Sequence, residues 1–425
     1  MTAFSNKLFI RICLCLTACF FFIPAGHAGE VKVYFATTRQ NDGSARNPRY
    51  GGKRHLDLGH GSLDYGQAQI VKPGSLASLE QARAWSTYKA RMKANDIAWQ
   101  TTRIANLEQI SPDAFYKMVS QWNGTLLLFL HGYDESFDDS LRDTAVIANE
   151  LEKRDGQDQL PVLPILFSWP SVDNTTDYAT DEANITWSEE PFSAFVQKLV
   201  KAKQPHCSLH IVAHSLGSRL AFGLTDDLHR YETAPVSKLI FSSADYDYHQ
   251  ALQKKADLEK LVSDSINILV SDRDGPLITS QLLHGSPRLG RPLDPPHVSR
   301  KPADYTKKTF WKQILSDAAD ILITDDVSDN TQVTDWLERQ PGRDTEFGQR
   351  TKLVDVSELV SQDLGHRLAW PVIGSLLSST GSLYPLSTRI VHKRPDKLYM
   401  EQTHDKPEFL YRYHRVAADR FGIEK

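Results

Sequence analysis

Cysteine is nearly absent from this chain once its first residues are set aside. Of the four cysteines, three lie among the first 19 residues, and Cys207 stands alone in the rest of the chain. A lone cysteine cannot form an internal disulfide, even in an oxidising compartment. Cys207 flanks a strand-like run, where a small buried apolar residue is the plain interpretation.

A surplus of positive charge is also missing. The 425 residues include 49 Lys and Arg against 53 Asp and Glu, which gives a formal net charge of -4. No basic stripe with interleaved aromatic residues appears, and this argues against a nucleic-acid-binding protein. The metal-binding patterns H-E-x-x-H and paired C-x-x-C are absent as well, so the sequence predicts no metal site.

The N-terminus carries a candidate targeting segment, residues 1–28. Lys7 and Arg11 provide a positive start, an apolar run reaches Ile23, and small residues follow at a possible cleavage site. Arg11 leaves the uncharged stretch too short to span a membrane comfortably. We therefore expect an exported protein whose signal peptide is removed. The alternative is a lipoprotein, because the residues ending at Cys19 resemble a bacterial lipobox, and membrane contact is expected only in that case.

Strand-like and helix-like segments alternate through much of the chain. Continuous apolar runs such as 126–130 are typical of parallel strands covered on both faces. The strands predicted in this way are residues 31–36, 126–130, 162–167, 209–212, 239–241, 266–270 and 352–356. Helical patterns lie between them. This alternation predicts a mostly parallel, doubly wound α/β sheet, whose ligands bind beyond the carboxyl ends of the strands.

Two of the predicted helices have recognisable starts and apolar faces. The first begins at Ser136, with Asp139 three residues later in a pattern like a capping box. Its predicted buried face carries Phe137, Leu141, Ala145 and Ala148. The second follows Pro191, and its predicted buried face carries Phe192, Phe195, Val196 and Leu199. Residues 41–65, by contrast, are rich in glycine and basic side chains and are predicted to form loops.

The most informative stretch is Ala213–Gly217, which directly follows the strand predicted at 209–212. The helical pattern after it places leucines four residues apart, at Leu216, Leu220, Leu224 and Leu228. This arrangement is the nucleophile elbow of an α/β-hydrolase, with alanine in place of the first glycine of G-x-S-x-G. At such a turn the Ser215 Oγ is exposed beside backbone amides at a helix start. The alternative is a buried serine in an ordinary loop, and the flanking strand and helix favour the elbow.

An elbow serine needs a carboxylate and then a histidine later in the chain. The strand ending at Val270 leads into a turn that contains Asp272 and Asp274, and either carboxylate suits the histidine Nδ1–H. Asp245 and Asp247, after the preceding strand, are a third option. An aspartate in such a loop is often only a turn former.

His366 is the candidate general base, because it lies in the loop after the last predicted strand, where this fold delivers its histidine. The alternative is a solvated loop histidine. His404 also lies late in the chain, but in a charged segment with no strand predicted before it.

The oxyanion hole is expected to combine two backbone amides, those of Leu216 and Tyr133. Tyr133 lies in the loop after the 126–130 strand, and Gly132 before it permits a tight turn. His131, at the start of this loop, is predicted to shape the loop rather than to carry protons.

Several stretches together resemble a family of bacterial α/β-hydrolase-like proteins of largely unknown function. They are residues 34–39, 131–133 with 136–137, 166–171, the elbow at 213–217, and 283–290. The resemblance covers about residues 31–294 and resumes from about 354 to 366. It implies Asp274 rather than Asp272 as the acid, and His366 as the histidine. Family members usually follow that histidine with Ser or Tyr, whereas Arg367 follows it here, which bears on the shape of the pocket.

The predicted organisation is an α/β-hydrolase fold with an insertion before the last strand. Its parts are a signal peptide at 1–28, an N-terminal part of the hydrolase domain with a loop-rich segment at 29–120, the core at 121–294, the insertion at 295–350, and a C-terminal part of the core with a tail at 351–425.

These patterns predict a serine hydrolase that cleaves a carboxylic ester through an acyl-enzyme. Ser215 is the nucleophile, His366 the base and Asp274 the orienting acid, and the chemistry needs no cofactor. The expected partner is a small-molecule or lipid-like ester, of unspecified acyl length, and the oligomeric state is open. The alternative is a catalytically inactive α/β-hydrolase fold that acts as an exported binding or envelope-associated protein, since fold does not dictate function.

Overall fold

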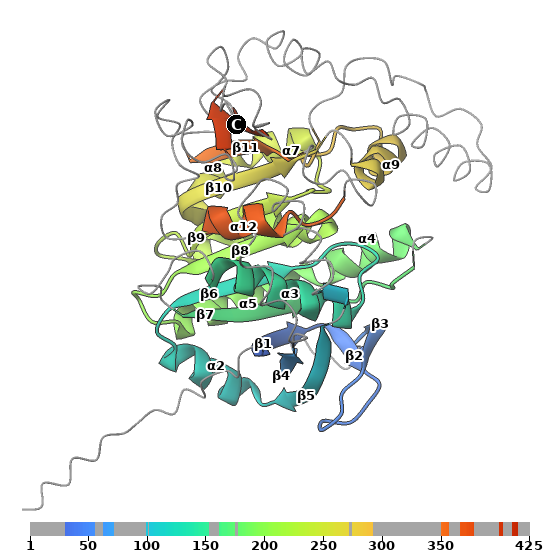
Figure 1. Cartoon of the computed structure of the whole chain (residues 1–425), viewed down its shortest axis with the longest axis vertical. Coiled ribbons are helices and arrows are strands. Elements are labelled where there is room, and N and C mark those ends of the chain that lie inside the picture. The colour runs from blue at the N-terminus through green and yellow to red at the C-terminus, as the bar shows by residue number, and fades with distance from the viewer. Residues whose placement is uncertain are drawn as a thin grey trace, which may run out of the picture.

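In the computed structural model, helices cover both faces of one large sheet (Figure 1). The structure describes residues 30–55, 63–71, 99–100, 102–152, 161–174, 177–271, 274–291, 350–356, 366–377, 399–402 and 410–414. The predicted signal segment, Asp272, His404 and all but the last residue of the predicted insertion lie outside these ranges.

The sheet has eleven strands in the order β12-β13-β11-β10-β9-β8-β6-β7-β1-β4-β5. Their bounds are β1 Glu30–Thr37, β4 Asp64–Val71, β5 Arg103–Ile110, β6 Thr125–Leu130, β7 Val162–Ser168, β8 Leu209–His214, β9 Val236–Ser242, β10 Val262–Val270, β11 Thr351–Asp355, β12 Tyr399–Gln402 and β13 Leu410–His414. From β13 to β1 every neighbouring pair is parallel. The pairs β12·β13, β1·β4 and β4·β5 are antiparallel. The prediction of a mostly parallel sheet is therefore confirmed.

Alternate residues of the central strands face two separate apolar cores. In β6, Leu126, Leu128 and Leu130 belong to one core, and Leu127 and Phe129 belong to the other. The first core is completed by α2 (Pro112–Gln121), α4 (Tyr178–Trp187), α5 (Glu189–Ala202), α6 (Ser218–Gly223), α7 (Tyr248–Gln253) and α8 (Lys255–Leu261). The second is completed by α3 (Phe137–Glu152) and α12 (Trp370–Leu377) (Figure 1). Burial on both faces explains why these strands are continuously apolar.

The predicted start of α3 and the predicted buried faces of α3 and α5 agree with the structure, whereas α5 begins at Glu189, two residues before Pro191. Ser136 Oγ accepts the Asp139 amide at 3.1 Å, as the capping pattern predicts. All the apolar side chains predicted for the buried faces of these two helices are buried. The helix predicted after the elbow is interrupted: 3₁₀ turns at Ser215–Gly217 (η3) and Leu224–Arg230 (η4) flank α6.

Two predictions about strands were wrong. The region 41–65 contains β3 (Tyr50–Arg54), which pairs with β2 (Arg39–Asn41) in a separate small sheet, and the start of β4. The strand β11 is also not the last one, because β12 and β13 follow it at the edge of the sheet. β5 is an edge strand whose residues are all partly or fully exposed, so it lacks the apolar run that identifies the central strands.

Among the helices in the described ranges, none combines the length and the apolar character that crossing a membrane requires.

Candidate active site

The predicted elbow is a strained turn in the structure. β8 ends at His214, η3 begins at Ser215, and Ser215 has a φ of 50°. A non-glycine residue in this left-handed region is uncommon, and such strain persists only where the surroundings hold it. The Ser215 carbonyl accepts the Asp245 amide at 3.0 Å and the Ser218 hydroxyl at 2.7 Å. These two hydrogen bonds hold the turn in place.

Two glycines let the loop after β6 lie directly against the elbow. A Cβ on Gly217 would come within 2.5 Å of the His131 carbonyl oxygen. A Cβ on Gly132 would lie 2.9 Å from the Ser215 Cβ and 2.9 Å from the His214 Nδ1. Side chains at these positions would push the loop away from the serine, so the close approach requires glycine.

The structure brings the three predicted residues Ser215, His366 and Asp274 together. The Ser215 Oγ lies 2.9 Å from the His366 Nε2. The His366 Nδ1 lies 2.7 Å from the Asp274 Oδ1 and 2.9 Å from its Oδ2. A carboxylate can only accept here, so the Nδ1–H donates to Asp274, and Nε2 is then free to accept from the serine hydroxyl. This is the geometry of a nucleophile, a base and an orienting acid.

Asp274 is held by a helix as well as by the histidine. It is the N-cap residue of α9 (Gly275–His284), and its Oδ1 accepts the Leu277 amide at 3.0 Å. Its side chain is fully buried. A carboxylate that caps a helix has little freedom to rotate, so Asp274 offers His366 a pre-oriented acceptor.

The other aspartates considered as the acid have different partners. Asp245 accepts the Tyr178 hydroxyl at 2.5 Å and the Ser280 hydroxyl at 2.6 Å. Asp247 caps α7 through the Gln250 amide at 2.9 Å. Neither is hydrogen-bonded to His366, and Asp272 lies outside the described residues.

The protonation of His366 is governed by two opposing effects. Burial alone would lower the pKa of its imidazole, but the Asp274 carboxylate outweighs burial through its charge and its hydrogen bond. The charges of Asp245 and Glu135 add to this effect, so the pKa of His366 lies above its ordinary value. The imidazolium that forms when His366 accepts a proton is therefore stabilised in place.

The residues predicted for the oxyanion hole lie on the two segments that meet at the elbow. Leu216 is the second residue of η3, and Tyr133 follows Gly132 in the loop after β6. The Gly132 amide already donates to the Glu135 Oε2 at 3.0 Å, so it has a partner within the protein. The Tyr133 ring packs against Tyr178 with centroids 5.2 Å apart, which anchors this side of the loop.

His131 is buried and bonded on both ring nitrogens. Its Nε2 accepts the Trp169 amide at 3.1 Å, so Nδ1 carries the proton and donates to the Gly132 carbonyl at 2.9 Å. The ring stacks on Trp169 with centroids 4.9 Å apart. Burial lowers the pKa of His131 to about 4, which keeps it neutral. These contacts agree with the loop-shaping role predicted for it.

Arg39 supports the same loop, and sequence reasoning missed it. Its guanidinium is buried and donates to the Glu135 carbonyl at 2.9 Å, to the Ser171 and Gly51 carbonyls at 3.0 Å each, and to the Ser168 hydroxyl at 2.8 Å. Burial lowers its pKa to about 10, so it remains charged at neutral pH. The signal available in the sequence was its place at the end of the family-like stretch 34–39.

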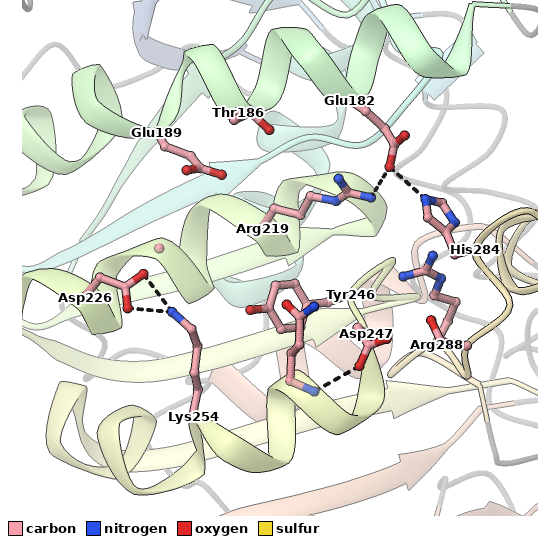
Figure 2. Close-up of a pocket in the computed structure, with 13 residues that line it drawn as sticks. Glu182, Thr186, Glu189, Arg219, Asp226, Tyr246, Asp247, Lys254, His284 and Arg288 are labelled. Atoms are coloured by element: carbon pink, nitrogen blue, oxygen red, sulfur yellow. Dashed lines mark hydrogen bonds and ion pairs between the residues drawn. The ribbon is translucent and has the colours of Figure 1, made fainter.

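A polar pocket of about 430 Å³ lies between α4, α6 and α7 (Figure 2). Its lining does not include the three residues of the triad. Most of its charges are paired: Glu182 contacts Arg219 at 2.5 Å and His284 at 2.8 Å, and Lys254 contacts Asp226 at 2.6 Å. Within the described ranges, no group of three or more His, Cys, Asp or Glu side chains is placed to hold a metal ion.

Comparison with known proteins places this geometry in a family. No curated protein and no solved structure matched the chain. A family model described as "Alpha/beta hydrolase of unknown function (DUF900)" matches residues 111–338, a range that contains Ser215 and Asp274. His366 and Arg39 lie outside it. The match covers more than half of the chain, and the protein therefore belongs to this family of α/β hydrolases.

Proposed function

We propose that this protein is a serine hydrolase that cleaves a carboxylic ester through a covalent acyl-enzyme. The observation that carries the proposal is the continuous hydrogen-bond chain from the Ser215 Oγ through His366 to Asp274, with Ser215 on a strained elbow. A base held by a buried acid and aimed at a strained serine is the arrangement that activates a hydroxyl nucleophile.

In the first half of the reaction the Ser215 Oγ attacks the ester carbonyl carbon while His366 Nε2 takes the hydroxyl proton. Asp274 stabilises the resulting imidazolium. The Leu216 and Tyr133 amides donate to the negative oxygen of the tetrahedral intermediate. When the intermediate collapses, the bond to the alcohol breaks, and His366 returns the proton to the leaving alcohol.

In the second half water attacks the acyl-enzyme. His366 takes a proton from the water, the bond from Ser215 to the acyl group breaks, and the serine recovers its proton as the carboxylic acid leaves. Amides and thioesters react through the same steps. Hydrolysis is therefore the proposed reaction class, and an ester is the bond that we propose is cleaved. We further propose that the protein is exported, on the strength of residues 1–28, and that its substrate is a small-molecule or lipid-like ester.

Hydrolysis of p-nitrophenyl esters of increasing chain length tests this function, with Asp274→Asn as the key variant. Asn offers one acceptor oxygen where both the Leu277 amide and the His366 Nδ1–H need one, and we expect kcat/KM to fall by about 10³–10⁴. Asp247→Asn is the matched control, because Asp247 also caps a helix but is not hydrogen-bonded to His366. Equal loss in both variants, or none in Asp274→Asn, would rule out the assigned acid. A wild-type protein that hydrolyses none of the series, together with amide and thioester analogues, would favour the non-catalytic binding protein.

A further inference from the structure

His214 lies at the active site but has no role in the proposed reaction. It immediately precedes Ser215, and its side chain is only 12% exposed. Its Nε2 lies 3.1 Å from the backbone carbonyl oxygen of His366. A carbonyl oxygen only accepts, so this nitrogen carries a proton and donates it. The two imidazole rings lie 5.1 Å apart, with an angle of 44° between their planes.

Glu135 lies on the other side of the His214 ring. Its Oε2 is 3.9 Å from the His214 Nδ1 and also accepts the Gly132 amide. Burial would raise the pKa of Glu135, but contacts with His214 and His131 and the Gly132 amide together lower it. The side chain is therefore a carboxylate at neutral pH, facing the edge of His214 that points away from His366.

The backbone of His366 has little other support among the described residues. His366 comes before α12, and within the described ranges the hydrogen bond from His214 is the one that its backbone makes. The side-chain bonds to Ser215 and Asp274 hold the ring of His366, whereas the bond from His214 holds its backbone. A shift of about 1 Å at a catalytic group is enough to cost a large factor in rate.

We propose that His214 positions the catalytic histidine through its hydrogen bond to the His366 backbone carbonyl. The His214 Nε2–H holds this carbonyl so that the His366 ring lies between Ser215 and Asp274. Glu135 lies beside His214 and binds the loop that carries Tyr133 through the Gly132 amide. The expected effect of His214 on the reaction rate rests on the proposed function, whereas its expected effect on the geometry of His366 does not.

The test is an NMR titration of His366 in protein with ¹³C-labelled histidines, with the signal assigned from its loss in His366→Asn. His214→Phe keeps a flat ring but removes the donor. If His366 then tilts away from Asp274, burial dominates and the pKa of His366 falls below its wild-type value. Other charged groups that act on His366 are Asp245 and Glu135. The substitution removes the His214 contact of Glu135 but leaves its contacts with His131 and the Gly132 amide.

Two variants serve as controls for this titration. His214→Gln retains an N–H donor and is expected to keep the pKa of His366 close to the wild-type value. His210→Phe makes the same ring substitution at a buried histidine of the same strand and is expected to leave His366 unchanged. Should His214→Phe fail to fold, His214→Asn, whose side chain is too short to reach the carbonyl, takes its place.

Kinetics provide the second readout. In His214→Phe we expect kcat to fall by about 10- to 100-fold with KM little changed, because a positioning residue affects the chemical step. A pKa of His366 that is the same in His214→Phe as in the wild type would overturn the proposal. The titration remains decisive even if the wild-type protein hydrolyses no ester, so failure of the positioning proposal is distinguishable from failure of the proposed function.

Discussion

The acid that orients His366 also determines the pH at which His366 can act. In the proposed mechanism only the neutral imidazole accepts the Ser215 proton, so we expect kcat/KM to be low below the pKa of His366 and to rise through it. Asp274 raises that pKa above its ordinary value, despite the opposing effect of burial. The expected loss of activity on acidification therefore sets in at a higher pH than the ordinary pKa of histidine would give.

We expect the acidic limb of the kcat/KM profile to have its midpoint above about 6.5, the ordinary pKa of histidine. The measurement is the initial rate of ester hydrolysis against pH at low substrate concentration. Asp274→Asn removes the charge that raises the pKa, so its residual activity should show a midpoint at lower pH. A wild-type midpoint below 6.5 would contradict the assigned pair.

Some residues of the site are marked by a pattern in their own stretch of sequence, and others are not. Ser215 is marked by its own pentapeptide and His366 by its place after a strand, whereas position left Asp272 and Asp274 open and the family resemblance implied Asp274. Arg39 and Glu135, by contrast, act because they are buried, and burial of a charged side chain depends on segments far away in the chain. A charged residue in a sequence is most often a solvated one, so nothing local marked Glu135, and Arg39 stood out only as the last residue of the family-like stretch 34–39.

At the scale of elements, the elbow depends on how closely β8, η3 and the loop after β6 approach one another. Gly217→Ala places a Cβ within 2.5 Å of the His131 carbonyl oxygen, and we expect it to destabilise the protein by about 1–3 kcal/mol. It should also lower activity, because the displaced atoms belong to the loop that carries Tyr133. Denaturant unfolding and ester hydrolysis measure the two effects.

Gly223→Ala, at the end of α6, is the matched control for this substitution. Gly223 is helical, and a Cβ built on it meets no atom within 4 Å. The same change should therefore stabilise the protein by about 0.5–1 kcal/mol, since alanine loses less backbone freedom on folding. If the two variants were equally stable, the close approach at Gly217 would not be what requires glycine there.

The elements that sequence reasoning predicted are those buried on both faces. β6, β7 and β8 are almost wholly buried, and their apolar runs predicted them within one or two residues. β3 and β5 carry polar side chains along exposed or half-exposed backbone. In an edge strand only one face needs to carry apolar side chains, so its sequence pattern resembles that of a loop. The prediction of loops over 41–65 failed for this reason.

At the scale of the whole molecule, the active site depends on parts of the chain outside residues 111–338. β1 pairs in parallel with β7, and Arg39, just beyond β1, binds the loop after β6. His366 comes from the other end, next to α12, which packs with α3 in one core. The residues before 111 are thus structurally continuous with the hydrolase core.

Arg39→Lys tests this continuity. Lysine keeps the charge but cannot reach all four acceptors that the guanidinium spans, of which three are buried. Each buried acceptor left without a donor costs about 1–3 kcal/mol. We expect a loss of about 3 kcal/mol or more in the free energy of unfolding. Arg49→Lys, at an exposed arginine of the same region, should change stability by no more than about 0.5 kcal/mol. Equal effects would show that Arg39 is not a structural anchor.

Reaction with a fluorophosphonate probe tests whether Ser215 is an activated nucleophile. In folded wild-type protein we predict a single covalent adduct, located on Ser215 by peptide mapping. The adduct should be absent from Ser215→Ala and from unfolded wild-type protein, because activation requires the assembled site. Folded wild-type protein that gives no adduct at Ser215, or that is labelled as strongly after Ser215→Ala, would contradict the account.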